Sequence, residues 1–326
     1  VKNKMIFKNV ELIPFNFKRM ADDNYLITSV TGDFEFISQD NLKKIIVRDE
    51  SLDLELYLKL KSKFFLMSQN AIGSKRALTS RLHAKKSTIL EGTSLHIIVV
   101  TIQCMHSCSY CQVSRQQAGD EFTISRKDLL LACDTIFEST SDTLTVEFQG
   151  GDPLIKYDLV KLAIEYITEK NKEHNRSIRF VVTTTLHQLT SEMCLFFKEH
   201  QVVLSTSIDG LADLHNKNRP IANRDAYERT IEGLELARQE LGQDSVSALM
   251  TTTRKSLNYP SEIVDAYVQL GFKDIFIRGL SDYGFAKKNS KRLAPTHAEF
   301  LDFYEKALER VIHWNDRGYE LIEVHS

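Results

Sequence analysis

Two patterns of hydrophobic positions divide the chain near Glu91-Gly92-Thr93. Before this point the apolar residues form short, mixed runs, and the turn Thr31-Gly32-Asp33 indicates a hairpin. The elements predicted there are strands at 25–30 and 33–38 and helices at 42–46 and 52–60. We therefore expect a small α+β module over residues 1–70. A basic run predicts a helix over 71–90, and we interpret residues 71–92 as a basic helical linker whose charges face solvent.

From residue 93 onward the hydrophobic period alternates between 2 and 3.6, which is typical of strands alternating with helices. The predicted strands cover 95–102, 143–149, 178–184, 202–208, 246–252 and 274–278. The predicted helices cover 126–138, 159–172, 191–200, 225–241, 261–270 and 297–317, the last opened by a capping box at Thr296 and Glu299. Six βα units in a row predict an α/β fold with a parallel sheet, either a partial TIM-like (β/α)6 barrel or a doubly wound sheet. Both folds place functional residues at the carboxyl ends of the strands.

Composition and charge exclude several classes of function. The 326 residues suffice for two domains, and 42 Lys and Arg against 44 Asp and Glu give a net charge of −2. Without a basic field, the chain is not expected to bind nucleic acid or an acidic membrane surface. The longest apolar runs have five residues, whereas a membrane span needs about 20. Residues 1–20 do not resemble a signal peptide, so we expect a cytoplasmic protein.

Three of the five cysteines lie within eight residues, in Cys104-Met-His-Ser-Cys108-Ser-Tyr-Cys111, directly after the first predicted barrel strand. A disulfide framework would be even-numbered and dispersed, so this group indicates a metal site in a reducing compartment. The C-x3-C-x2-C spacing lets one loop present three thiolates to three irons of an iron–sulfur cluster, leaving the fourth iron open. A zinc site is the alternative, with His106 as a fourth ligand, although no second cysteine pair follows.

This loop resembles the signature of the radical SAM superfamily, where SAM is S-adenosyl-L-methionine. The signature is C-x3-C-x-aromatic-C, and a tyrosine fills the aromatic position here. After the second barrel strand comes Gln-Gly-Gly-Asp-Pro at 149–153, where the family has Gly-Gly-Glu-Pro for the methionine amino group of SAM. The aspartate is a departure that shortens the reach but keeps an acceptor. The resemblance implies a [4Fe-4S] cluster on Cys104, Cys108 and Cys111, and SAM contacts from Tyr110, Gln149, Gly150, Gly151 and Asp152.

After the fourth barrel strand, Ser207-Ile208-Asp209-Gly210 followed by His215-x3-Arg219 closely resembles a segment of peptide-modifying members such as sulfatase maturases. In those enzymes the serine and the arginine contact the ribose and the carboxylate of SAM. The resemblance therefore assigns these contacts to Ser207 and Arg219, with Asp209 as a further cofactor-binding residue. An arginine fork suits a carboxylate. The segment around Leu280 resembles the one that packs on adenine, which makes Leu280 another candidate.

The resemblance also implies a reaction and its partners. SAM would chelate the open iron, one electron from the cluster would cleave its S–C5′ bond, and a 5′-deoxyadenosyl radical would take hydrogen from a substrate carbon. Along most of the chain the match is to SPASM-type peptide maturases, most like those of the His-Xaa-Ser system, through strings such as that at 110–116. The expected partners are a ribosomally made precursor peptide and an electron donor such as flavodoxin or ferredoxin. The module over 1–70 is either a plain stabilising cap or a peptide-binding domain that resembles the small winged-helix-like domains that grip leader peptides.

Two departures from this family keep other functions open. No cysteine follows Cys194, so the auxiliary-cluster ligands of SPASM enzymes have no counterpart, and we expect a fragment or a shortened member. Cys133 and Cys194 share apolar helix faces and are expected in the core. Together with Asp152, the missing extension also fits a catalytically silent SAM-fold scaffold that binds a peptide. A zinc-binding interaction module is the third alternative.

Overall fold

The computed structural model describes residues 7–20, 24–90, 92–117 and 119–324. The chain divides between Gly92 and Thr93 into two compact units, and each has its own cluster of buried hydrophobic residues. Glu91, part of the predicted break, lies outside the described residues. Among the described helices, none is both long and apolar enough to cross a membrane.

The first unit combines antiparallel strands with helices. Its described elements are β1 (Val10–Leu12), β2 (Phe15–Arg19), β3 (Asn24–Ser29), β4 (Phe34–Ser38), α1 (Gln39–Val47), α2 (Leu54–Ser62), β5 (Leu66–Ser68) and α3 (Ile72–Leu90). Strands β2, β3 and β4 form one sheet in that order, so a strand that the pattern did not predict precedes the predicted hairpin. Strand β1 pairs with β5.

Helix α3 uses part of its basic surface within this unit. Arg81 forms an ion pair with Asp33 at 3.1 Å, and the Nζ of Lys85 donates to the carbonyl of Val30 at 3.2 Å. Two of the basic side chains expected to face solvent therefore contact the turn between β3 and β4.

The second unit alternates strands with helices, as the hydrophobic pattern predicts. Its strands are β6 (Leu95–Thr101), β7 (Thr143–Gly150), β8 (Ser177–Thr183), β9 (Val203–Ser207), β10 (Val246–Thr251), β11 (Asp274–Arg278) and β12 (Ile322–Glu323). Its helices are α4 (Arg126–Ile136), α5 (Tyr157–His174), α6 (Ser191–Glu199), α7 (Ala212–Asn218), α8 (Ala226–Leu241), α9 (Pro260–Gln269), α10 (Gly284–Leu293) and α11 (His297–Asn315). The predicted capping box at Thr296 and Glu299 opens α11.

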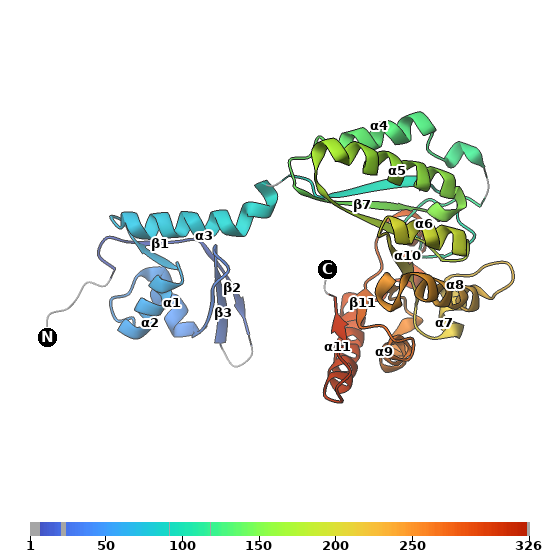
Figure 1. The fold of residues 1–326 in the computed structure, drawn as a ribbon. Helices are drawn as coiled ribbons and strands as arrows, with labels where there is room; N and C mark the ends of the chain where they lie inside the picture. Colours follow the sequence, from blue (N-terminus) through green and yellow to red (C-terminus); the bar gives the residue numbers. More distant parts are fainter. Residues whose placement is uncertain (1–6, 21–23, 91, 118, 325–326) are drawn as a thin grey trace. The chain divides into compact units, whose positions relative to one another are not determined.

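The sheet order decides between the two folds that the sequence left open. The strands lie in the order β12-β11-β10-β9-β8-β7-β6, and each neighbouring pair is parallel. Each strand therefore lies beside its neighbour in the sequence, without the reversal of order that defines a doubly wound sheet. Helices α4 and α5 lie side by side along β7 (Figure 1). This arrangement is a partial TIM-like α/β barrel.

Alternation along the strands separates the core from the interior of the barrel. In β7, Leu144, Val146 and Phe148 are buried, whereas Glu147 and Gln149 are only partly buried. Successive side chains of a strand point to opposite faces, so the apolar set packs against the helices and the polar set faces the barrel interior.

Candidate functional site

A cavity of about 200 Å³ lies at the carboxyl ends of the barrel strands. Its wall combines strand ends with the cysteine-bearing segment, which we call the Cys loop and define as residues 102–117. The residues that line it include Cys108, Tyr110, Cys111, Glu147, Gln149, Gly150, Gly151, Thr183, Ser205, Ser207, Arg219, Thr251, Arg278, Gly279 and Ser281. Seven of the predicted site residues, together with Arg219, therefore line one cavity.

The Cys loop is fastened to the barrel by backbone hydrogen bonds. The N–H of Asp152 donates to the carbonyl of Gln103 at 2.7 Å, and the N–H of Ser107 donates to the carbonyl of Pro220 at 2.7 Å. The N–H of Ala286, in α10, donates to the carbonyl of Cys111 at 3.1 Å. The loop is therefore held at its start, middle and end by three different connections of the barrel.

Gly150 and Gly151 leave room for this loop. Gly150 has a φ of +133°, and a Cβ there would lie 2.0 Å from the carbonyl oxygen of Thr101. A Cβ on Gly151 would lie 1.9 Å from the carbonyl oxygen of Gln103. Any side chain would push the Cys loop away, so both glycines are required by the close approach of two backbones.

The three cysteine side chains have the properties of a cluster-binding set. Burial is the main cause that raises the pKa of Cys104 to about 11 and of Cys108 to about 12. The charge of Cys111 is among the causes of both shifts, as expected for sulfurs that lie near one another. The buried thiols are therefore protonated at neutral pH, and binding of iron would displace those protons.

A single zinc ion fits this arrangement less well. Among the described residues, no group of three or more His, Cys, Asp or Glu side chains is arranged to hold one metal ion. His106, the fourth ligand of the zinc alternative, instead packs on His187 with the ring centroids 4.6 Å apart. Cysteine thiolates are the ligands of iron–sulfur clusters, so three cysteines on one loop suit such a cluster by their chemistry.

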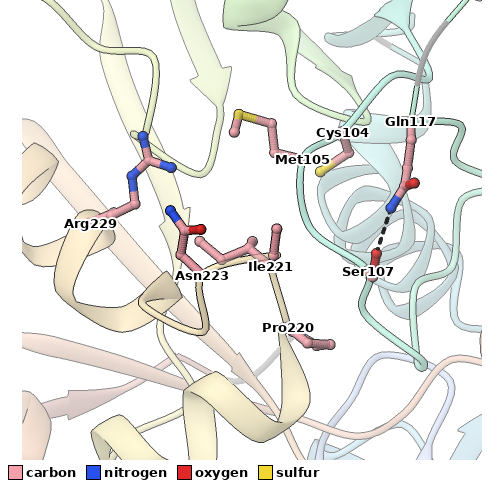
Figure 2. A pocket seen from close by; sticks show the side chains of 9 residues that line it. Cys104, Met105, Ser107, Gln117, Pro220, Ile221, Asn223 and Arg229 are labelled. Atoms are coloured by element: carbon pink, nitrogen blue, oxygen red, sulfur yellow. Dashed lines mark hydrogen bonds between the residues drawn. The ribbon is translucent and has the colours of Figure 1, made fainter.

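Cys104 does not line the barrel cavity and instead lines a second hollow. Figure 2 shows Cys104, Met105 and Ser107 facing a segment with Pro220 and Ile221, with Arg229 of α8 behind it. A hydrogen bond of 3.0 Å from Gln117 to Ser107 stiffens the loop here. Different residues of the Cys loop therefore line the two hollows, 108 and 110–113 the barrel cavity and 104, 105, 107 and 117 the second one.

Arg219 lies at the cavity wall in contact with two other predicted site residues. Its Nη2 donates to Oδ1 of Asp209 at 3.1 Å, and its guanidinium lies 5.3 Å from the ring centroid of Tyr110. The Nε of Arg219 is buried and has no hydrogen-bond partner among the described groups. An unpartnered cationic donor at a cavity wall suits an anionic ligand group such as a carboxylate.

Two predicted cofactor contacts are placed differently from the expectation. Asp152 is 1% exposed, and its carboxylate accepts hydrogen bonds from the hydroxyls of Thr184 and Thr185 and from the N–H groups of Leu154 and Thr185. Asp209 is fully buried. Neither lines the cavity, because protein donors already occupy both carboxylates. Leu280 lies between Gly279 and Ser281, which do line it, and packs beside the buried Cys108 and Tyr110.

Several cavity residues were not among the sequence candidates. Glu147 accepts hydrogen bonds from Gln149 at 2.7 Å and from Thr183 at 2.6 Å, and Arg278 donates to Gln112 at 2.7 Å. The signal of Glu147 in the sequence is alternation, because it lies two residues before Gln149 and so shares its face of β7, whereas Arg278 is the last residue of β11. Ser205, two residues before Ser207, follows the same rule.

Comparison with known proteins agrees with this site. The sequence profile of the radical SAM superfamily matches residues 98–266. An uncharacterized protein of Methanocaldococcus jannaschii is 24% identical over 222 residues, 67% of this chain and 72% of that protein. The PqqA peptide cyclase of Bradyrhizobium diazoefficiens is 26% identical over 221 residues, covering 66% of this chain and 54% of that enzyme.

Solved structures with the same fold extend the comparison. The structure of anSMEcpe with bound AdoMet and a peptide covers 70% of this chain and 62% of its own, at 15% identity and a TM-score of 0.59. Streptococcus suis SuiB bound to its precursor peptide SuiA covers 97% of this chain and 72% of its own, at 14% identity and a TM-score of 0.54. The profile match spans just over half of the chain, from the first barrel strand to α9. The chain belongs to the radical SAM superfamily, whose cofactors are an iron–sulfur cluster and S-adenosylmethionine.

Proposed function

We propose that this protein uses a [4Fe-4S] cluster and SAM to abstract hydrogen from a ribosomally made peptide, as a post-translational maturase. The observation that carries the proposal is the single loop with Cys104, Cys108 and Cys111, fastened over a polar cavity at the strand ends. Three thiolates leave one iron of a cubic cluster without a protein ligand.

The residues around the cavity suit the parts of SAM. Gly150 and Gly151 carry backbone groups next to the Cys loop and would meet the methionine end, together with Gln149. Arg219 would bind the carboxylate, Ser207 the ribose, and Tyr110 and Leu280 would border the cofactor from the Cys loop and the β11 end. When bound, the two cofactors supply one-electron cleavage of SAM and removal of a hydrogen atom from a substrate carbon.

Peptide as the substrate class rests on relatives and on the first unit. The PqqA peptide cyclase is named for a peptide, and SuiB was solved with its precursor peptide. In the described part of the first unit, strand β4 pairs only with β3, and its Phe34 and Phe36 are each 55% exposed. An open strand edge beside exposed aromatic side chains suits an added peptide strand. We therefore propose that the module over residues 1–70 binds the peptide. We also propose that the protein is one of the His-Xaa-Ser maturases.

The first test is anaerobic reconstitution with iron and sulfide, followed by dithionite and SAM. We expect a brown protein that forms 5′-deoxyadenosine, and loss of both properties in Cys108→Ala. Cys133→Ala is the matched control, because that thiol is fully buried in the barrel core. It should keep the cluster and the product.

The outcomes separate the proposal from its alternatives. Stoichiometric zinc in a colourless protein would support a zinc-binding interaction module. A brown protein that binds SAM and never cleaves it would support the silent scaffold. The electron donor is then tested by replacing dithionite with reduced flavodoxin or ferredoxin, which should sustain the same product.

The peptide is tested by co-expression with each short open reading frame beside the gene. Mass spectrometry of the purified peptide should show a loss of hydrogen that depends on Cys108. If no neighbouring peptide changes mass while 5′-deoxyadenosine still forms, the substrate class is wrong and the radical chemistry stands.

A further inference from the structure

Asp209 lies at the centre of a buried polar cluster just outside the cavity wall. Its Oδ2 accepts a hydrogen bond from the hydroxyl of Tyr110 at 2.5 Å, and its Oδ1 accepts one from Arg219 at 3.1 Å. Oδ1 also accepts from the N–H of Thr251 at 3.3 Å. The side chain of Asp209 is fully buried, so it reaches the cavity only through these neighbours.

The three donors come from different parts of the fold. Tyr110 belongs to the Cys loop and stands next to Cys111, Arg219 follows α7, and Thr251 ends β10. All three line the cavity. One carboxylate therefore fixes three parts of the cavity wall at once, including the loop that carries the thiols.

The electrostatics of the cluster keep each group in a single state. Burial alone would raise the pKa of Asp209, but the charges of Arg219 and His215 and the hydrogen bonds from Tyr110 and Arg219 together outweigh it, and the pKa is lowered. The hydroxyl of Tyr110 is the donor in its hydrogen bond to Oδ2 of Asp209. A charged acceptor with a neutral and a cationic donor forms strong, short hydrogen bonds.

We propose that Asp209 is a positioning residue, which orients Arg219 toward the SAM carboxylate and ties that arginine to the Cys loop through Tyr110. The inference rests on the proposed function. The sequence predicted that Asp209 contacts SAM directly. The burial of Asp209 and its three protein donors argue against that contact, and the positioning role takes its place. Arg219 binds the ligand, and Asp209 sets the direction in which its remaining donors point.

Asp265 offers a matched control for this role. Its carboxylate accepts two hydrogen bonds from Arg310, at 2.7 and 2.9 Å, and one from Trp314 at 2.7 Å. The partners are again an arginine and an aromatic donor, but they join α9 to α11 and none of them lines the cavity. Asp265→Asn thus makes the same chemical change at a carboxylate that contributes to the stability of the fold and not to the cavity wall.

The experiment compares reconstituted wild type, Asp209→Asn and Asp265→Asn. Binding of SAM to the oxidised holoenzyme is measured by equilibrium dialysis, and the reduced cluster is followed by EPR with and without SAM. For Asp209→Asn we expect the Kd for SAM to rise about tenfold or more and the SAM-induced change of the EPR signal to weaken. For Asp265→Asn we expect a lower Tm and an unchanged Kd.

Each outcome decides a separate question. A wild type without a cluster or without SAM binding overturns the proposed function itself. A wild-type Kd in Asp209→Asn, or equal changes in Kd for both variants, overturns the positioning role. If Asp209→Asn fails to fold, Tyr110→Phe decides, because it removes a single hydrogen bond. It should weaken SAM binding about threefold, and a wild-type Kd there would overturn the coupling to the Cys loop.

Discussion

Two buried histidines, His106 of the Cys loop and His215, lie beside the half-buried His187. Burial, together with the charge of Arg219, lowers the pKa of His215 to about 3. Its Nδ1 accepts a hydrogen bond from the N–H of Asp209 at 3.4 Å, which needs the neutral ring. The histidine is therefore part of the support of the cofactor cavity only while it is unprotonated.

This burial predicts a loss of stability in mild acid. The unfolded pKa of histidine is about 6.5, so below that value the unfolded chain binds a proton that the folded chain refuses. The contribution of the neutral histidine to stability is fully present above its pKa in the unfolded chain. It is lost as the pH falls toward its pKa in the folded chain, by about 1.4 kcal/mol per pH unit for each histidine of this kind. Between pH 6.5 and 5 the free energy of unfolding should fall less in His215→Asn than in the wild type, and the difference should reach about 2 kcal/mol at pH 5. Urea titrations at each pH measure it.

The control for this prediction is His297→Asn, since that histidine is exposed at the start of α11. Its pH profile should follow that of the wild type. If His215→Asn keeps the wild-type slope, the ring is protonated in the folded state and the hydrogen bond from Asp209 is absent.

At this scale the sequence located the site residues better than it assigned their contacts. The motif predicted the thiols and Arg219 at one edge of the sheet, and Cys108, Cys111 and Arg219 line one cavity there, whereas Cys104 lines the neighbouring hollow. Asp152 and Asp209 were predicted as cofactor contacts, but both bind protein donors. A motif shows which residues lie near a site, whereas partner donors from Thr184 or Tyr110 depend on packing between distant segments.

Helix α10 connects the Cys loop to the far side of the barrel. The N–H of Ala286 and the side chain of Asn289 donate to the carbonyls of Cys111 and Ser109, the latter at 2.9 Å. Ala286 and Leu293 pack on Cys108 and Tyr110. This element therefore holds the part of the loop that carries two of the three thiols.

Removing one of these bonds should loosen the loop without unfolding the barrel. Asn289→Ala is expected to lower the free energy of unfolding by about 1 kcal/mol and to speed the release of iron to a chelator. Asn315→Ala is the control, because the side chain of Asn315 forms hydrogen bonds with the backbone of Leu321, in the segment that follows α11 and away from the Cys loop. Equal rates of iron release in both variants would show that α10 does not secure the loop.

The elements that the pattern missed share weak hydrophobic periodicity. Helix α10 buries only Ala286 and Leu293 in a polar sequence, and α7 has seven residues. Strand β2 is largely exposed, and β12 has two residues. Periodicity reports on faces that a core covers, so elements fixed by a few tertiary contacts leave little signal. The six long strands with buried faces were all predicted within a few residues.

At the scale of the whole molecule, the two units have separate cores. Ile27, Ile45 and Leu60 are fully buried in the first, whereas Val146, Ile164 and the other barrel residues form a cluster that shares no member with it. The sequence indicated this division through the change of hydrophobic pattern near residue 92. Separate cores allow the peptide-binding and SAM-binding tasks of the proposed function to be altered one at a time.

A pair of equivalent substitutions tests this independence. Ile27→Ala removes a fully buried side chain from the first core, and Ile164→Ala does the same in the barrel core. Each should destabilise its own unit by about 3 kcal/mol, from lost burial and the cavity left behind. Hydrogen exchange read by mass spectrometry should show faster exchange in β3 and α1 for the first variant, and in β7 and α5 for the second.

Each variant serves as the control for the other, because the chemical change is identical and only the core differs. Ile27→Ala should keep the wild-type Kd for SAM, whereas Ile164→Ala should weaken it as strands next to the cavity open more often. Faster exchange in the barrel strands of Ile27→Ala would contradict independent cores. The first unit would then stabilise the SAM site directly, and a bound peptide would be expected to tighten SAM binding through the same coupling.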